Sequence, residues 1–173
     1  MSPTSSWPPW TNQPIVLYHG TVGSYAANIL RNGIDVTRGA PIRDFGRGFY
    51  TTTLLSQARG RADMVGASRN GSPAIVKMTL DRTALGSLIA LTFLRGSLDA
   101  VDYWSFVAHC RAGFAGDPQT NPRYDVVYGP VARTWWGPDR SSIYRDYEQI
   151  SFHSDRAHAL LRNSSFCKIE VIE

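Results

Sequence analysis

The chain has 173 residues, of which 43% are hydrophobic and 18% are charged, and its formal net charge is +4. This length and composition are typical of a single folded domain and exclude an intrinsically disordered chain. Two cysteines are too few for a disulfide-stapled fold, and the four histidines show no metal-ligand spacing, so we expect no metal centre. The sequence opens without a signal-peptide pattern and contains no apolar run that spans a bilayer, which predicts a cytoplasmic protein that does not contact a membrane.

Arginine supplies 16 of the 18 basic residues. Its planar guanidinium group suits phosphate, so this bias is consistent with a polyphosphate or a nucleic-acid ligand. A coding sequence of high GC content gives the same bias, and the basic residues form no run. Charge alone therefore does not predict nucleic-acid binding.

Turn residues and hydrophobic periodicity divide the chain into a tail or linker at residues 1–13 and one domain at 14–173. In chain order, the domain is predicted to contain a strand at 15–18, a helix at 24–32, a loop at 39–48, a strand at 49–53, a helix at 55–68, a strand at 74–80, a helix from 97, a loop at 113–122, a strand at 124–128, a polar loop at 132–145, a strand at 149–153, a helix at 154–161 and a strand at 166–172. Ser24, Asp99 and Ser154 are the expected helix caps, and Gly33 is expected to end the first helix. Strands this close together do not fit regular βαβ units, so the predicted fold class is α+β.

A histidine followed by glycine ends the first predicted strand, in the segment His19-Gly20-Thr21. Because glycine has no side chain, a ligand can approach the backbone there and exchange hydrogen bonds with the imidazole. The alternative interpretation is a histidine that is satisfied within the core.

A glycine-rich loop leads into the second predicted strand. Arg43 and Arg47 in this loop are suited to phosphate groups, and the glycines at 46 and 48 allow close backbone approach. Tyr50 offers an aromatic face to a flat ring. The alternative is an ordinary turn with a core phenylalanine and tyrosine.

A late strand begins with Glu148 and Gln149, and only three glutamates occur in the whole chain. A carboxylate or amide at this point can hold a ribose hydroxyl or stabilise a developing cation. The alternative is a solvated start of a strand. Neighbouring strand residues face opposite ways, so both side chains cannot point at one ligand without a bulge.

Four segments, taken in order, resemble the bacterial DUF3990 family, and they begin at Leu17, Arg43, Tyr124 and Glu148. The resemblance spans roughly residues 15–162 and is most specific in the Asp-Phe-Gly-x-Gly-Phe-Tyr segment that ends at Tyr50. This family is grouped with ADP-ribosyltransferase-like folds of the His-Tyr-Glu/Gln class. The resemblance therefore implies a split β-sheet core with short flanking helices.

The same resemblance implies the site. His19 is expected to bind the NAD ribose, Tyr50 to stack on nicotinamide, and Gln149 to contact the nicotinamide ribose, with Glu148 in reserve. The NAD-binding set that it implies also includes Gly20, Thr21, Arg43, Phe45, Gly46, Gly48, Phe49 and Thr51. Acceptor contacts are expected from the loop before the third element, at Arg133, Trp135 and Trp136.

The activity implied is transfer of ADP-ribose from NAD, as co-substrate, to a macromolecular acceptor, either RNA, DNA or protein. A bacterial toxin or conflict-system effector is the expected role, with a cognate antitoxin or immunity protein as a further partner. Two alternatives stay open: an NAD glycohydrolase, and an inactive NAD- or ADP-ribose-binding module. We expect alanine at His19, Tyr50 or Gln149 to abolish turnover, and alanine at Glu148 to matter less.

Overall fold

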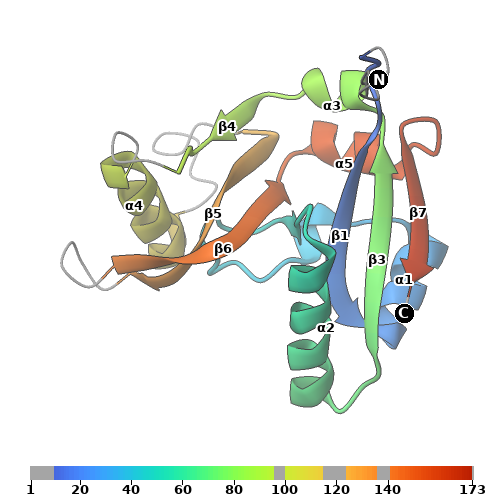
Figure 1. Cartoon of the computed structure of the whole chain (residues 1–173), viewed down its shortest axis with the longest axis horizontal. Coiled ribbons are helices and arrows are strands. Elements are labelled where there is room, and N and C mark those ends of the chain that lie inside the picture. Colours follow the sequence, from blue (N-terminus) through green and yellow to red (C-terminus); the bar gives the residue numbers. More distant parts are fainter. Residues whose placement is uncertain (1–9, 96–99, 115–123, 136–140, 173) are drawn as a thin grey trace, which may run out of the picture.

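A computed structural model describes residues 10–95, 100–114, 124–135 and 141–172 (Figure 1). Within these residues the chain forms two β-sheets with short flanking helices, so the predicted α+β class is confirmed. In chain order the elements are β1 (Ile15–Val22), α1 (Gly23–Asn32), the 3-10 helix η1 (Val36–Arg38), β2 (Phe49–Thr51), α2 (Leu55–Arg69), β3 (Pro73–Leu80), α3 (Arg82–Gly86), β4 (Ala90–Thr92), α4 (Ala100–His109), the π-helical turn η2 (Cys110–Phe114), β5 (Val126–Trp135), β6 (Ser141–Phe152), α5 (Asp155–Arg162) and β7 (Cys167–Ile172).

The first sheet has the strand order β1-β3-β7, and its neighbouring strands are antiparallel. Alternation along β3 directs Val76, Met78 and Leu80 into the main hydrophobic core, which α1 and α5 also join. Ile75, the residue before Val76, packs on the other face against Ala58 and Ala62 of α2. Figure 1 shows α2 running alongside β1 and β3.

The second sheet has the order β2-β6-β5-β4, with a parallel pair only between β4 and β5. One face of this sheet contributes Ile150 and Phe152 to the main core. On the other face, Val127 packs with Tyr103 and Val107 of α4 in a second hydrophobic cluster. Strand β6 therefore separates two cores, and consecutive residues of β6 point into different surroundings.

The two sheets meet where β1 lies beside β2. Tyr18 and Thr52 exchange both backbone hydrogen bonds, at 2.7 and 2.9 Å, as an isolated bridge. Beyond this bridge the two strands are not paired within the described residues. The sheet is therefore split between β1 and β2.

Several local predictions are confirmed. Ser154 caps α5 by accepting a hydrogen bond from the backbone N–H of Ala157. Gly33 ends α1 with a φ of 77°, a left-handed angle that glycine adopts without strain. The helix at α2 and the strands β2, β3 and β7 lie where they are predicted, within a few residues.

Other predictions need correction. Ser24 does not cap α1, because the helix begins at Gly23 and Val22 occupies the cap position. Strand β1 continues to Val22, so His19 lies inside a strand and not at its end. Helix α3 and strand β4 fall in a stretch for which no elements were predicted.

The largest correction concerns the polar loop predicted at 132–145. Strand β5 runs through Gly129 and Pro130 to Trp135, and β6 begins at Ser141, so much of this loop forms paired strands. Its polar residues lie in exposed parts of the hairpin, where cross-strand hydrogen bonds and not burial hold the backbone. Hydrophobic periodicity in the sequence does not predict such a strand, because few of its side chains are buried.

Two predictions lie partly outside the described residues. The tail at 1–13 is described from residue 10 onward, where no helix or strand forms before Ile15. The expected cap Asp99 is not described. Among the described residues, no helix combines the length and apolar character needed to cross a membrane.

Candidate functional site

His19 is fixed at the split between the sheets. Its Nδ1 lies 2.7 Å from the carbonyl oxygen of Tyr50, and its ring stacks on Phe49 with centroids 4.4 Å apart. Burial lowers the pKa of His19 below its usual value of 6.5, so the imidazole is neutral at pH 7. Because a carbonyl only accepts, Nδ1 carries the proton and donates it, and Nε2 is left as a hydrogen-bond acceptor.

Gly20 follows His19 on the same strand edge. Since Tyr18 bonds to β2, strand alternation directs the N–H and C=O of Gly20 towards β2 as well, into the split. A Cβ at this position would lie 2.0 Å from the carbonyl oxygen of Ala58 in α2. The missing side chain therefore allows α2 to pack directly against β1.

Tyr50 lies on the face of the second sheet that carries the second hydrophobic cluster. Its hydroxyl donates to the carbonyl of Gly46 at 2.7 Å and accepts from the N–H of Phe45 at 3.0 Å. The rings of Phe45 and Tyr50 are stacked, with centroids 6.4 Å apart. The glycine-rich loop is thus folded onto Tyr50.

Gln149 shares this face with Tyr50, because Tyr50 pairs with Ser151, two residues further along β6. Its side chain is buried. The amide nitrogen donates to Asp44 Oδ2 at 2.7 Å and to the carbonyl of Pro130 at 2.8 Å. Both partners are acceptors, so the orientation of the amide is determined and Oε1 points away from them.

Asp44 is the centre of this network. Its carboxylate also accepts from the backbone N–H of Ala132 at 2.8 Å and forms an ion pair with Arg111. The guanidinium of Arg111 in turn lies 3.5 Å from the centroid of the Trp135 ring. Buried and fully hydrogen-bonded, Asp44 joins the glycine-rich loop to η2, β5 and β6.

Glu148 points to the opposite face of β6, as alternation requires. Its Oε1 accepts from the N–H and the hydroxyl of Thr53, and its Oε2 accepts from the Tyr128 hydroxyl at 2.9 Å. The side chain of Gln57 in α2 binds both backbone groups of Glu148, at 2.7 and 3.1 Å. This arrangement fastens α2 to the second sheet.

Two arginines lie near the split. Partial desolvation of the Arg61 guanidinium, with the nearby Arg43 cation, lowers the pKa of Arg61, and the Arg61 charge also acts on His19. Within the described residues neither arginine forms an ion pair with a carboxylate. Two neighbouring cations without a counter-ion favour an anionic ligand.

The remaining predicted residues have the following positions. Thr21, Phe45, Gly46, Gly48, Phe49 and Thr51 are buried, whereas Arg43 and Arg133 are exposed. The hydroxyl of Thr51 donates to the carbonyl of Ile150 at 2.9 Å. A Cβ at Gly48 would lie 2.7 Å from His153, so this glycine makes room for a neighbouring ring. Trp135 is partly buried beneath Arg111, and Trp136 lies outside the described residues.

Sequence reasoning did not single out Asp44, Arg111, Gln57 or Arg61. Asp44 is the one carboxylate in the glycine-rich loop at 39–48, and this was a usable signal. Its partner Arg111 is 67 residues away, and no local pattern links the two. Gln57 and Arg61 lie in a predicted helix that contains many small residues. Polar side chains of such a helix are ordinarily expected to face solvent.

Two hollows in the surface are lined by other residues. One is lined by residues of α1, α5 and β7, including Ile29 and Leu161, and another by α3 and α5 residues such as Ala84 and Leu160. Neither contains His19, Tyr50 or Gln149 among its lining residues. At the candidate site itself, the glycine-rich loop contacts the Tyr50 hydroxyl through the backbone of Phe45 and Gly46.

Comparison with known proteins bears on the chain as a whole. A protein-family model, described as DUF3990, protein of unknown function, matches residues 15–165. A search of the curated proteins finds no match to the chain. The matched segment extends from β1 to just before β7 and includes His19, Tyr50, Glu148 and Gln149. The chain therefore belongs to the DUF3990 family.

Proposed function

We propose that the chain is an NAD-dependent ADP-ribosyltransferase with an ADP-ribosyltransferase-like fold, and that His19, Tyr50 and Gln149 form its site. These residues are far apart in sequence but come from three strands that adjoin one another, β1, β2 and β6. The split between β1 and β2 supports the fold assignment, because it leaves backbone groups of a strand open to a ligand.

The observation that carries the proposal is the way in which His19 and Gln149 are held. Each side chain is neutral and donates to a backbone carbonyl, that of Tyr50 or of Pro130. Each then presents a fixed acceptor, Nε2 or Oε1, that accepts no hydrogen bond from the described residues. Two preorganised acceptors suit a ligand that is rich in hydroxyl donors, such as the riboses of NAD.

The charges around the split suit the rest of NAD. The Arg61 charge acts on His19 and the Arg43 charge acts on Arg61, and neither arginine forms an ion pair with a carboxylate of the described residues, so a pyrophosphate would satisfy both. The N–H and C=O of Gly20 face the same split and match the paired donor and acceptor of a carboxamide. Tyr50 provides an aromatic ring beside them once the loop residue Phe45 moves away.

In the proposed reaction, the bond between nicotinamide and C1′ of the ribose breaks through an oxocarbenium-like state. Nicotinamide leaves with the electron pair of that bond. A lone pair of the acceptor forms the new bond to C1′, and the acceptor proton passes to solvent. Hydrogen bonds from ribose hydroxyls to His19 and Gln149 orient the sugar for this step.

Glu148 is not the third element in this proposal. Three hydrogen bonds from Thr53 and Tyr128 occupy its carboxylate, and its side chain lies on the face of β6 opposite Tyr50. Gln149 shares the Tyr50 face and keeps its Oε1 available. An amide without charge makes the proposed enzyme a modest catalyst, because it retains the hydrogen bond but not the electrostatic attraction.

The test is to incubate the purified protein with NAD labelled in its adenylate part, and with RNA, single-stranded DNA or a protein extract in separate tubes. We expect nicotinamide release together with label in one of the three fractions. Rapid nicotinamide release without any acceptor would identify an NAD glycohydrolase instead. NAD binding without nicotinamide release in any tube would identify an inactive binding module.

A further inference from the structure

The strand β6 bulges immediately before the proposed site. Its partner β5 advances by two residues, from Pro130 to Ala132, while β6 runs from Glu148 back to Ile143. Three extra residues must therefore be accommodated on β6, in the segment 144–147. All four side chains of this segment are exposed. A bulge of this kind projects side chains that a regular strand would hold in the sheet.

Two tyrosines of the bulge form an aromatic stack. The rings of Tyr144 and Tyr147 are nearly parallel, at 22°, with centroids 5.2 Å apart. Tyr144 is 43% exposed and Tyr147 41%, so the pair offers ring surface to solvent. A guanidinium nitrogen of Arg95 donates to the backbone carbonyl of Tyr147 and holds the end of the bulge in place.

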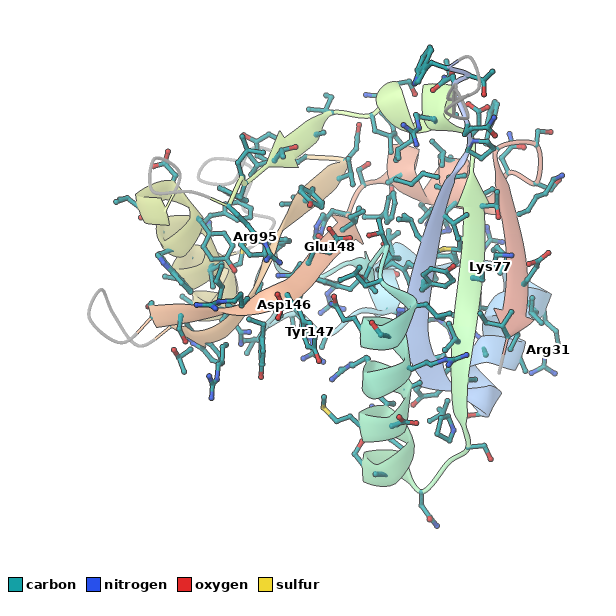
Figure 2. The ribbon with its side chains drawn as sticks, viewed as in Figure 1. Arg31, Lys77, Arg95, Asp146, Tyr147 and Glu148 are labelled. Atoms are coloured by element: carbon teal, nitrogen blue, oxygen red, sulfur yellow. The ribbon has the colours of Figure 1, made fainter. Side chains whose placement is uncertain are left out.

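Two arginines of the β5–β6 hairpin lie in or beside the bulge. Arg133 lies on β5 between the residues that pair with Ile143 and Ser142, and Arg145 lies within the bulge. Both are exposed, and neither forms an ion pair with the carboxylates that the structure describes. Asp146 is the acidic member of the bulge. Figure 2 shows Arg95, Asp146, Tyr147 and Glu148 gathered along β6.

We propose that the bulge at 144–147 is a binding platform for single-stranded nucleic acid, on whose tyrosines an unpaired base stacks. The combination of open aromatic rings and unpaired arginines matches the stacking and phosphate contacts by which proteins hold single strands. A protein acceptor would favour a more apolar surface, whereas the bulge exposes charged side chains, Arg145 and Asp146, beside its tyrosines. Base stacking is thus assigned to these two tyrosines and not to Trp135, because the guanidinium group of Arg111 covers the Trp135 ring.

The platform's position gives it a role in the proposed transfer, and this part rests on the proposed function. Tyr147 precedes Gln149 by two residues, about 7 Å along an extended strand. A base held there brings its amine or ribose hydroxyl near the C1′ of bound NAD. The acceptor lone pair forms the bond to C1′, nicotinamide leaves with the electrons of the broken bond, and the acceptor proton passes to water.

Binding is tested first without NAD, by fluorescence anisotropy of labelled mixed-sequence DNA and RNA oligonucleotides. We expect a single strand to bind, and a duplex of the same sequence to bind at least about tenfold more weakly because its bases are already stacked. Tyr147→Ala and Tyr144→Ala should each weaken binding of the single strand about tenfold, while Tyr147→Trp retains it. Equal affinity for the duplex, or full affinity in both alanine variants, would overturn the proposal.

A matched control and a salt series separate stacking from charge. Tyr25 is 46% exposed on α1, at the other sheet, and Tyr25→Ala should leave affinity unchanged. Arg133→Ala and Arg145→Ala should each lower the slope of affinity against salt concentration by about one, whereas the tyrosine variants keep the wild-type slope. A loss of affinity in Tyr25→Ala equal to that in Tyr147→Ala would show a global effect and contradict the platform.

The platform and the proposed function can fail separately. If single strands bind through the tyrosines but NAD is never cleaved, the platform stands as a binding site and the proposed function falls. If NAD is cleaved while label goes to protein, at a rate that Tyr147→Ala does not change, the proposed function stands and the platform falls.

Discussion

The two faces of β6 at Glu148 and Gln149 differ in what they do for the molecule. Glu148 has its carboxylate and both backbone groups bound by Thr53, Tyr128 and Gln57, which makes it a structural tie between α2 and the second sheet. The Gln149 side chain is also anchored, but its bonds to the described residues are made through its amide nitrogen alone. The comparison teaches that the charged residue of a pair is not necessarily the one free to meet a ligand.

The largest expected effect comes from the removal of Asp44, whose carboxylate orients the Gln149 amide. Asp44→Ala leaves the Arg111 cation without its partner, and we expect the free energy of unfolding to fall by about 3–5 kcal/mol. Chemical denaturation followed by circular dichroism measures this change. The exposed Asp63 on α2 provides a control, since Asp63→Ala should change stability by less than about 0.5 kcal/mol. A similar loss in both variants would mean that the network does not hold the loop.

Matched substitutions of Glu148 and Gln149 test which face of β6 takes part in the proposed reaction. Gln149→Met and Glu148→Met keep side-chain length and remove the polar end of each residue. We expect the rate of nicotinamide release to fall by about 10²–10³ in Gln149→Met, as for loss of one preorganised group, and by less than about threefold in Glu148→Met. Rates are compared after confirming that both variants are folded. The reverse ranking would assign the site to the Glu148 face.

The protonation of His19 provides a pH test of the same site. Burial lowers the pKa of His19 below 6.5, so Nε2 keeps its acceptor lone pair at neutral pH and loses it as the pH falls through the lowered pKa. The rate constant kcat/KM for NAD should therefore be level near pH 7 and fall as pH decreases, about tenfold per unit below the lowered pKa. His19→Gln keeps an acceptor that does not titrate, and its residual activity should lack this fall. An acid limb that persists in His19→Gln would exclude His19 as its source.

The smallest expected effect is on the Glu148 face. Tyr128→Phe removes one hydrogen bond to Glu148 and should lower the free energy of unfolding by about 1 kcal/mol, without changing NAD turnover. Tyr124→Phe serves as the control, because the Tyr124 hydroxyl forms no hydrogen bond with the residues that the structure describes, and it should leave stability unchanged. A large loss of turnover in Tyr128→Phe would indicate that this face takes part in the chemistry.

Local signals in the sequence were sufficient for several elements. The Ser154 cap and the Gly33 terminus depend on neighbouring residues alone, so α5 and the end of α1 were predictable. The β5–β6 hairpin depends on pairing between exposed strands, and its register cannot be derived from burial periodicity. Strand β4 likewise depends on pairing with the distant β5, whereas α3 has a local cap, Asp81, which sequence reasoning missed.

The candidate site was predictable in its residue types but not in its connections. Alternation in a strand indicated that Glu148 and Gln149 face opposite ways, yet not which of them shares a side with Tyr50. That answer needs the register between β2 and β6, which joins residues about one hundred positions apart. The Asp44–Arg111 ion pair is likewise a product of the tertiary fold.

The most direct test of the proposed activity is the release of nicotinamide from NAD by the purified wild-type protein, followed by chromatography with single-stranded DNA, RNA or a protein extract present. The proposal predicts nicotinamide release that depends on acceptor and leaves ADP-ribose attached to it, with Gln149→Met at least about a hundredfold slower. Complete recovery of NAD from the wild-type protein with every acceptor would contradict it.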